Sequence, residues 1–423
     1  MRKIIIGVIS LTISALIITG CLNTNKYSME GVNRATEFPN EISINLESEE
    51  YGQEVNYIIN AIDKWYAHKD KKNIDIDLLR STYVTKAESA KSFSQFNIAL
   101  LKLFAELKNG HSNVYTGVPE YGVPILTALI EGKVVITYLG NQEQIDKKVE
   151  VGWVIEEIDN KPAREWMKER FSMISGSTPQ ALEQESLQWV FRRYEYEPKT
   201  REYLLTSPQG DQLNLELSLN IPRNELGIYQ FPPIEIKKLG DYGYIAINTM
   251  TDSIVEAFDE ALEQMLDKKG IVLDLRKNGG GNSLNGDQMV RRLIQKETDI
   301  WQGRSIKPYH GINYSGKVIA LVGPQTFSAA ESFAFDLSDS GRVITMGEPT
   351  KGDSGGGPVL FKTDGGIYFR FPTRGVDISA SGSPMEGIGL DPHIFQKQTY
   401  DDLLQGIDTL LESAIARMEE GYF

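Results

Sequence analysis

The chain has 423 residues, 41% of them hydrophobic, which is enough apolar mass for a sizeable core and, at roughly 150 residues per domain, for about three domains. Its 44 basic and 58 acidic side chains give a net charge of −14 without a basic cluster, which argues against nucleic-acid binding. The only long apolar run lies at the N-terminus, which excludes a multi-span membrane protein, and the single cysteine excludes an intramolecular disulfide and a cysteine-based zinc or iron–sulfur site.

The first 20 residues have the pattern of a secretory signal peptide. Arg2-Lys3 precedes an apolar stretch over residues 4–18, which is too short to read as a spanning helix. The run Ile18-Thr19-Gly20-Cys21 resembles a bacterial lipobox, which implies that Cys21 is acylated, with palmitate for example, and becomes the mature N-terminus. Acyl chains on Cys21 would anchor the protein to the membrane, outside the cytoplasm. An uncleaved anchor with a chance cysteine is the alternative, and residues 21–50 are interpreted as a tether.

Residues 51–118 are predicted to form an N-terminal helical domain. Apolar side chains recur at helical spacing over residues 55–66 and again over 93–107. Asn109-Gly110 is a good helix stop, because glycine takes a left-handed conformation without strain. His111 is therefore expected just past a helix end.

Residues 119–225 are predicted to form a β domain. Strands are expected at 133–139 and 153–158, followed by a hairpin over 203–219 that turns at residues 208–211. The segment 151–155 resembles part of a PDZ-type module, whose edge strand would capture an extended peptide. A structural insert that binds nothing is the alternative.

The remainder, residues 226–423, alternates between strand and helix patterns. The predicted strands are 243–248, 271–275, 318–322 and 342–346, and the predicted helices are 254–268, 284–295 and 328–338. This alternation indicates an α/β fold with a largely parallel, buried sheet. Ligands of such sheets bind at the carboxyl ends of the strands, so the loops there are the places to search for chemistry.

Ser328 is the candidate nucleophile. The segment 323–331 leads from a strand through a turn into a helix whose first turn contains Ser328. Unpaired backbone N–H groups and the positive end of the helix dipole would stabilise an oxyanion at this place. The alternative is purely structural, because Ser328-Ala329-Ala330-Glu331 also fits the capping-box pattern.

A second loop, Asp274 to Gly281, follows another buried strand and contains three consecutive glycines. Backbone N–H groups of Gly279 or Gly280, together with that of Ala329, could form an oxyanion hole. The loop lacks the lysine-plus-hydroxyl ending of a phosphate loop. A simple turn is the alternative.

A general base has to come from a short list of four histidines. His68 lies in a charge-rich helical pattern and is interpreted as a solvated residue. His310 lies in a polar loop, and His393 lies at a strand entrance. His111 is therefore the best candidate for an imidazole base.

Several motifs in this order resemble the serine peptidase family that includes the C-terminal processing (tail-specific) proteases, the tricorn core proteases and interphotoreceptor retinoid-binding protein. The motifs are residues 110–112, 274–281, 326–331, 347–352 and 386–392. The resemblance spans residues 51 to about 400 and implies a crotonase-like β/α catalytic core with a PDZ-like insert. It also implies a peptide or protein substrate and neither metal nor cofactor.

The resemblance implies one of two catalytic subtypes. Tail-specific members use a serine–lysine dyad, but their pattern places Asp353 where the lysine belongs, with Lys351 two residues away. Tricorn-like members use serine and histidine, supported by a glutamate and a further serine. Ser328, His111 and Glu386 fall on the first three positions, whereas Gly110 stands where the supporting serine is expected.

We favour the Ser–His subtype, with Glu386 orienting the network directly or through water; a surface carboxylate is the alternative for Glu386. The segment 352–356 copies the nucleophile loop of chymotrypsin-like proteases, but the chain lacks their paired barrels. Ser354 and a solvated Asp353 are therefore expected in a flexible loop beside the cleft. The sequence thus predicts a membrane-anchored, extracytoplasmic serine endopeptidase. A surface-tethered binder of peptides or hydrophobic ligands without catalysis is the alternative from another class.

Overall fold

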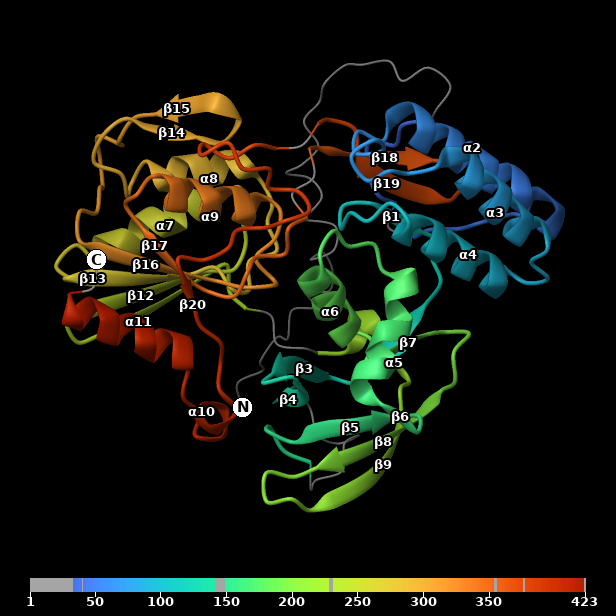
Figure 1. The fold of residues 1–423 in the computed structure, drawn as a ribbon, viewed down its shortest axis with the longest axis horizontal. Coiled ribbons are helices and arrows are strands. Elements are labelled where there is room, and N and C mark those ends of the chain that lie inside the picture. The colour runs from blue at the N-terminus through green and yellow to red at the C-terminus, as the bar shows by residue number, and fades with distance from the viewer. Residues whose placement is uncertain are drawn as a thin grey trace, which may run out of the picture.

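The computed structural model describes residues 33–39, 41–140, 149–227, 231–353, 356–375 and 377–421. The predicted signal peptide, Cys21 and Ser354 lie outside the described residues. The described chain forms a helical unit, a β insert and an α/β unit, and helix α6 (Pro179–Leu187) of the β insert lies where the three units meet in Figure 1. Within the described ranges, no helix is both long enough and apolar enough to cross a membrane.

Three helices build the helical unit. They are α2 (Tyr51–Trp65), α3 (Ile76–Glu88) and α4 (Phe93–Ala105). The side chains of Asp75 and Ser92 cap α3 and α4, because each accepts a backbone N–H of the first turn. The apolar faces of the helices meet in a core where Ile58 and Leu100 are fully buried.

A hairpin from much later in the chain completes this core. The strands are β1 (Asn113–Tyr115), β18 (Pro358–Lys362) and β19 (Tyr368–Pro372). They form one antiparallel sheet in the order β1-β19-β18, and Phe361, Phe369 and Phe371 are fully buried against the helices. The helical unit is thus not built from residues 51–118 alone, because the hairpin comes from the segment that was assigned to the catalytic core.

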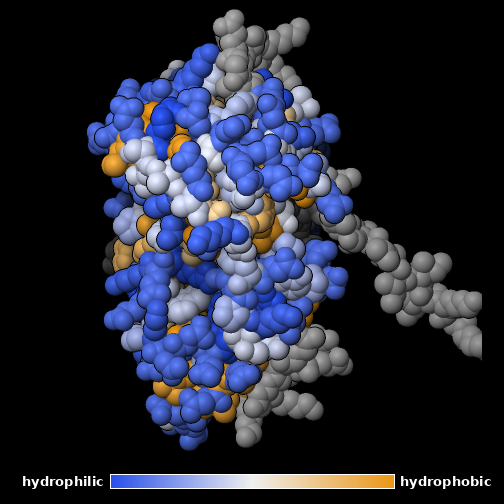
Figure 2. Space-filling model, turned by 90° about the vertical axis from the view of Figure 1, so that its right-hand side faces the viewer, coloured by the Kyte–Doolittle hydropathy of each residue, from blue (hydrophilic) through white to orange (hydrophobic). Residues whose placement is uncertain are grey.

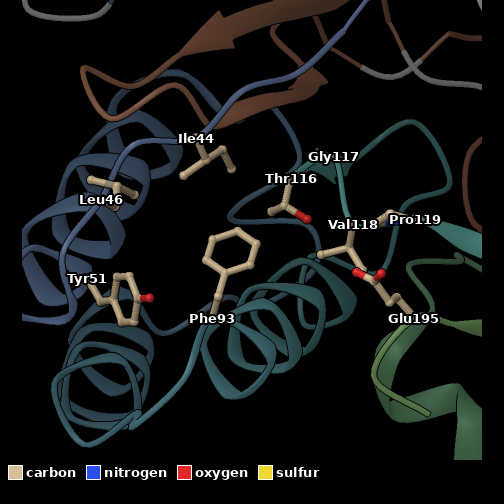
Figure 3. Close-up of a pocket in the computed structure, with 9 residues that line it drawn as sticks. All are labelled: Ile44, Leu46, Tyr51, Phe93, Thr116, Gly117, Val118, Pro119 and Glu195. Carbon is tan, nitrogen blue, oxygen red and sulfur yellow. The ribbon is translucent and has the colours of Figure 1, made fainter. Parts of the chain in front are cut away.

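Part of the predicted tether also packs on this unit. The N–H group of Ala35 donates to Leu360 O at 3.0 Å, which places the chain beside β18. Ile44 and Leu46 are half-buried and line an open pocket with aromatic side chains of α2 and α4 (Figure 3). The prediction of a tether over 21–50 is therefore wrong for its described, C-terminal part.

The β insert is an antiparallel sheet with two helices. Its strands are β3 (Ile125–Ile130), β4 (Lys133–Leu139), β5 (Val154–Ile158), β6 (Lys161–Pro162), β8 (Thr200–Thr206) and β9 (Gln212–Ser218), and its helices are α5 (Ala163–Arg170) and α6. The sheet order is β3-β4-β5-β8-β9, and β6 pairs with β5. The predicted strands and hairpin are confirmed, with Leu215 and Leu217 buried on one face of the sheet.

The opposite face of this sheet is covered by a helix of the α/β unit, α10 (Tyr400–Leu404). The hydroxyl of Tyr400 donates to Gly152 O at 2.6 Å. A smaller sheet, in the order β10-β2-β7, joins the insert to the chain around it. Its strands are β2 (Glu120–Gly122), β7 (Arg192–Tyr194) and β10 (Ile221–Pro222).

The α/β unit contains a six-stranded sheet in the order β11-β12-β13-β16-β17-β20. The strands are β11 (Ile234–Leu239), β12 (Tyr242–Ile247), β13 (Gly270–Asp274), β16 (Lys317–Val322), β17 (Ile344–Gly347) and β20 (Ile394–Phe395). All neighbours in this sheet are parallel except β11 and β12. The predicted α/β fold with a largely parallel, buried sheet is confirmed.

Helices cover both faces of this sheet (Figure 1). They are α7 (Ile254–Glu263), α8 (Ser283–Val290) and α9 (Ala329–Asp339) on one face and α11 (Thr409–Glu420) on the other. The helices α7 and α8 end about five residues earlier than predicted. Beyond these ends the chain continues in turns whose hydrogen bonds join residues three positions apart, such as Leu293 N to Val290 O. A small hairpin, β14 (Thr298–Ile300) and β15 (Arg304–Ile306), lies outside the layers. Short 3₁₀ helices lie at Ser48–Glu50, Phe171–Met173, Arg223–Glu225 and Trp301–Gly303.

The surface agrees with the composition. Figure 2 shows the side of the molecule that carries the helical unit and the β insert, and its described residues are mostly hydrophilic. Hydrophobic residues gather on this face in small, separate groups. Such a surface is expected of a chain in which 24% of the residues are charged.

Candidate active site

Ser328 lies at the carboxyl end of the sheet, where the chain turns from β16 into α9. Its φ of 59° and ψ of −124° are unusual for a residue with a side chain and cost on the order of 1–3 kcal/mol. Its backbone N–H donates to Glu331 Oε2 at 3.2 Å, so the expected contact with Glu331 of the capping box forms. Its Oγ lies 2.9 Å from His111 Nε2. The helix-start position and the contact with the histidine therefore coexist in one residue.

His111 reaches Ser328 from the helical unit, 217 residues earlier in the chain. The side chain of Asn109 accepts the His111 N–H at 3.0 Å, and the imidazole stacks on Phe327 with ring centroids 4.5 Å apart. The left-handed residue after α4 is Lys108, at φ 49°, and not Gly110 as expected. A left-handed backbone therefore does not explain the glycine at residue 110.

The imidazole of His111 is only 3% exposed. Burial, together with the positive charges of Arg370 and Lys351, holds its pKa well below the usual range. Interaction with the backbone of Asp353 acts in the opposite direction without offsetting these effects. His111 is therefore neutral at pH 7, the form that can accept a proton from Ser328.

The glycine loop packs directly on the Ser328 turn. A Cβ on Gly280 would lie 2.8 Å from Ser328 Cβ, and the N–H of Gly280 already donates to Asn278 Oδ1 at 2.9 Å. The N–H groups of Gly279 and Ala329 donate to no residue in the described part of the chain. Of the three residues expected at an oxyanion hole, Gly279 and Ala329 thus keep a free donor.

Glu386 is fully buried, so its alternative interpretation as a surface carboxylate is wrong. Its Oε1 accepts a hydrogen bond from Ser177 Oγ and forms an ion pair with Lys72 Nζ at 2.7 Å. Within the described residues, neither Glu386 nor any other carboxylate forms a hydrogen bond with the His111 ring. Glu386 therefore lies near the histidine loop but acts on it only through other residues.

Lys351, the candidate of the serine–lysine subtype, is occupied elsewhere. Its ammonium group pairs with Glu185 of α6 and lies 4.2 Å from the centroid of the Phe327 ring. Burial by itself lowers the pKa of Lys351, but Glu185 and Asp353 raise it above the ordinary value. A lysine held in its charged form is a poor general base.

Two residues lie in other surroundings than the sequence suggested. His68, expected on a solvated face, is fully buried after the end of α2, and burial lowers its pKa to about 4. Asp353, expected to be solvated, is also fully buried, and burial raises its pKa to about 6. His310 is exposed, and His393 Nδ1 contacts Thr345. None of these three histidines forms a hydrogen bond with Ser328 among the described residues.

Ser177 and Asp353 also contact the segments of the site, and sequence reasoning did not select either residue for it. Ser177 precedes α6 in a segment without a recognisable motif, so nothing in the local sequence marks it.

Among the described residues, no group of three or more His, Cys, Asp or Glu side chains is arranged to hold a metal ion.

A serine at a helix start, a buried neutral histidine at 2.9 Å and two free backbone amides define a hydrolase site of the nucleophilic type. Residues 241–395 match the model of peptidase family S41. The predicted resemblance to the serine peptidases of this family is thus confirmed over this part of the chain.

Two curated relatives illustrate the similarity. The chloroplastic C-terminal processing peptidase of Tetradesmus obliquus is 30% identical over 188 residues, which cover 41% of this chain and 39% of that protein. The tricorn protease of Thermoplasma acidophilum is 25% identical over 192 residues, which cover 43% of this chain and 17% of that protein. The chain thus matches less than half the length of these relatives.

The fold extends the similarity over most of the chain. The crystal structure of mature CPAF superposes with a TM-score of 0.75 at 14% identity, covering 88% of this chain and 98% of that one. A similarity at this identity concerns the fold, and it agrees with the predicted α/β core.

Proposed function

We propose that this protein is a membrane-anchored, extracytoplasmic serine endopeptidase in which Ser328 is the nucleophile and His111 the general base. The observation that carries the proposal is the 2.9 Å contact between Ser328 Oγ and His111 Nε2 in a buried site. Its substrate class, a peptide or protein, follows from the family. Two relatives, of which this chain covers less than half, are C-terminal processing proteases. C-terminal processing is therefore one form that the proposed hydrolysis could take.

In the proposed first step, His111 Nε2 takes the proton of Ser328 while Oγ attacks the carbonyl carbon of the scissile peptide bond. The negative charge that develops on the carbonyl oxygen is stabilised by the N–H groups of Ala329 and Gly279. The C–N bond then breaks, and His111 gives its proton to the leaving amine. This step leaves an acyl ester on Ser328.

In the second step, His111 removes a proton from a water molecule that attacks the ester. The carboxylic acid is released and Ser328 regains its proton. Glu386 supports both steps at a distance, because it accepts the hydroxyl of Ser177, whose Oγ also lies 3.0 Å from Lys108 O, three residues before the base. We assign Glu386 an orienting role on this basis.

Lys351 has a different role in this proposal. Its ammonium group stays charged beside Glu185 and supports one side of the Phe327 ring, on which the His111 imidazole stacks. The positive charge also lowers the pKa of His111. Lys351 therefore helps the base without taking a proton itself.

The location of the protein rests on its first residues. Acylation of Cys21 would hold the three folded units at the membrane surface, outside the cytoplasm. Incorporation of an alkyne-tagged fatty acid tests this: the label should appear in the wild-type protein and be lost in Cys21→Ser. An equally labelled Cys21→Ser protein would contradict the proposed anchor.

The catalytic assignment is tested by peptide hydrolysis, combined with alkyl fluorophosphonate labelling and location of the adduct by mass spectrometry. We expect an adduct on Ser328, and turnover reduced about 10³-fold or more in Ser328→Ala and in His111→Ala. Lys351→Met should keep measurable turnover. Wild-type turnover in either of the first two variants would refute the assignment. An inactive Lys351→Met with an active His111→Ala would transfer the base to the lysine. Ligand binding without any turnover by the wild type would support the binder alternative.

A further inference from the structure

The carboxylate of Asp353 lies buried between two backbone segments of other units. Its Oδ1 accepts the N–H of Gly110, directly before His111, at 2.8 Å. The same oxygen accepts the N–H of Ser177, from the segment before α6, also at 2.8 Å. Asp353 is fully buried, so these two charge-assisted bonds are shielded from water.

Asp353 explains why residue 110 is a glycine. A Cβ on Gly110 would lie 2.5 Å from Asp353 Oδ2 and 2.7 Å from Asp353 Cγ, which no real structure tolerates. Gly110 does not have a positive φ, so its backbone conformation alone would allow a side chain. The Asp353 carboxylate thus occupies the space that a side chain on residue 110 would take, including that of the serine expected there.

Asp353 is itself fixed to the nucleophile through Glu331. The Glu331 carboxylate accepts the N–H groups of Ser328 and Asp353, both at 3.2 Å, and that of Gly352 at 2.6 Å. One buried carboxylate on α9 therefore holds the backbones of the nucleophile and of the Asp353 loop together. Asp353 extends this connection to the residue beside the base.

We propose that Asp353 is a positioning residue for His111: its carboxylate fixes the backbone of Gly110 and thereby holds the imidazole in reach of Ser328. The inference rests on the proposed function, in which His111 is the base. Asp353 acts through backbone contacts and does not touch the reacting atoms, so it differs from a catalytic residue.

The second bond of Asp353 gives it a wider role. Ser177, whose N–H it holds, also donates its Oγ to the buried Glu386. Asp353 therefore fixes both Gly110 and the residue through which Glu386 supports the histidine loop. Loss of its carboxylate should release the two segments at once.

The proposal is tested by steady-state kinetics on the full chain with Asp353→Ala and Asp353→Asn. Displacing a base by about 1 Å can cost on the order of 100-fold in rate, so we expect kcat of Asp353→Ala to fall about 100-fold with KM within about twofold of wild type. The amide oxygen of Asp353→Asn can still accept both N–H groups, so this variant should recover to within about tenfold of wild type. Asp287→Ala, which removes a buried carboxylate on α8, is the matched control and should leave kcat near wild type.

A double variant separates the packing of residue 110 from the positioning role of Asp353. Gly110→Ser alone should lower kcat about 100-fold or more, because the new side chain meets the Asp353 carboxylate. Gly110→Ser combined with Asp353→Gly removes the clash but also the carboxylate that fixes residue 110, so its kcat should stay about as low as that of Asp353→Ala.

Three outcomes would overturn the proposal: kcat of Asp353→Ala within about threefold of wild type, an Asp353→Asn as inactive as a folded Asp353→Ala, or a double variant with kcat near that of the wild type. The Ser328→Ala and His111→Ala enzymes separate the two proposals. If both are inactive while Asp353→Ala is active, only the positioning role fails. If either keeps wild-type turnover, the catalytic assignment fails first.

Discussion

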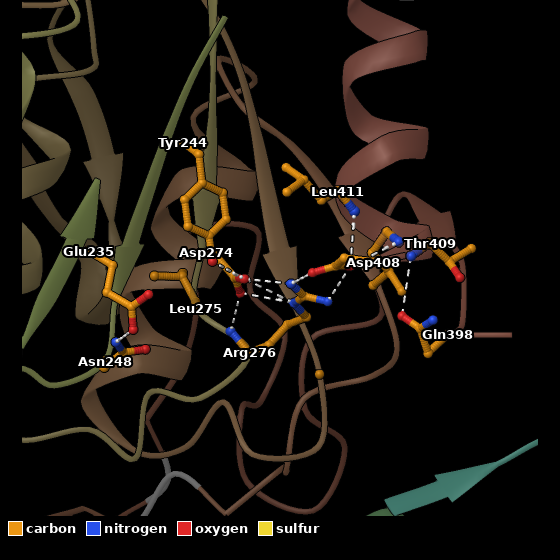
Figure 4. A network of polar contacts seen from close by, with 12 residues as sticks. Glu235, Tyr244, Asn248, Asp274, Leu275, Arg276, Gln398, Asp408, Thr409 and Leu411 are labelled. Carbon is orange, nitrogen blue, oxygen red and sulfur yellow. Dashed lines mark hydrogen bonds and ion pairs between the residues drawn. The ribbon is translucent and has the colours of Figure 1, made fainter. Parts of the chain in front are cut away.

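Replacing Arg276 with methionine should destabilise the α/β unit and disturb the glycine loop that follows it. The guanidinium group contacts two carboxylates at once (Figure 4). Its Nη1 and Nη2 donate to Asp408 at 3.0 and 2.6 Å, and its Nε and Nη2 donate to Asp274 at distances from 2.6 to 3.1 Å. Asp274 is the last residue of strand β13. Asp408 is the N-cap residue of α11, the helix that covers the face of the sheet opposite to α7, α8 and α9. Arg276 thus ties the strand end to the helix start.

The expected cost follows from what remains after the substitution. Arg276→Met leaves two carboxylates facing each other, and the side chain of Asp274 is only 8% exposed. Breaking a buried ion pair by removing one partner costs about 3–5 kcal/mol. The side chain of Asp408 is 35% exposed, so water screens part of this repulsion. We therefore expect a loss of about 3 kcal/mol in the free energy of unfolding.

Urea unfolding of the wild type, Arg276→Met, Asp408→Asn and the double variant measures this loss. Asparagine can still cap α11, so Asp408→Asn should cost only about 1 kcal/mol. The two substitutions should be non-additive, because each removes one side of the same pair. A loss below about 1 kcal/mol in Arg276→Met, or full additivity in the double variant, would refute this account of the network.

Three further predictions concern the site and its surroundings. Gly280 has a φ of +94°, and a Cβ there would lie 2.8 Å from Ser328 Cβ. Gly280→Ala should therefore lower kcat about 100-fold at nearly constant KM in initial-rate assays. A variant with the kcat of the wild type would contradict this packing. Burial raises the pKa of Asp336 to about 8, so the wild type loses stability as the pH rises from about 4 towards 8, by up to about 1.4 kcal/mol per pH unit. Asp336→Asn lacks this dependence. In unfolding curves at several pH values, the stability of the variant relative to that of the wild type should therefore increase as the pH rises. A difference in stability that does not change with pH would contradict the raised pKa of Asp336. A neutral His111 with a lowered pKa places the acidic limb of kcat/KM below pH 6.5, whereas a Lys351 base, with its raised pKa, would give activity that climbs above pH 10.

The sequence was most informative in the α/β unit. Buried parallel strands appear as continuous apolar runs, and Gly and Ser residues mark the loops at their ends, so the surroundings of Ser328 and the Gly279–Gly280 turn could be located from local patterns. His111 could be selected because the chain contains only four histidines. The contact between His111 and Ser328 is not local, and the family resemblance was needed to bring the two residues together.

Other residues of the site could not be found in this way, because their roles arise from contacts between distant segments. Asp353 lies 243 residues from Gly110 and 176 from Ser177, and its own neighbours in sequence suggested a solvated loop. His68 shows the same limit, since a charge-rich sequence around it concealed a turn into the protein interior. When another unit buries a polar residue, the apolar periodicity of the residue's own segment does not reveal the burial.

The proposed reaction changes the charge of His111, and the surroundings of this residue must serve both of its states. Before attack, burial and the charges of Arg370 and Lys351 keep the imidazole neutral. Once the imidazole takes the serine proton, the same burial would disfavour the imidazolium, and the oxyanion that forms in the same step is the negative charge that offsets it. Asp353 and Glu386 are the buried carboxylates tied to the histidine loop, each held by other groups and not by the ring itself. Such an arrangement leaves the base free to accept a proton, whereas a carboxylate bonded directly to the ring would raise the pKa of His111 in advance.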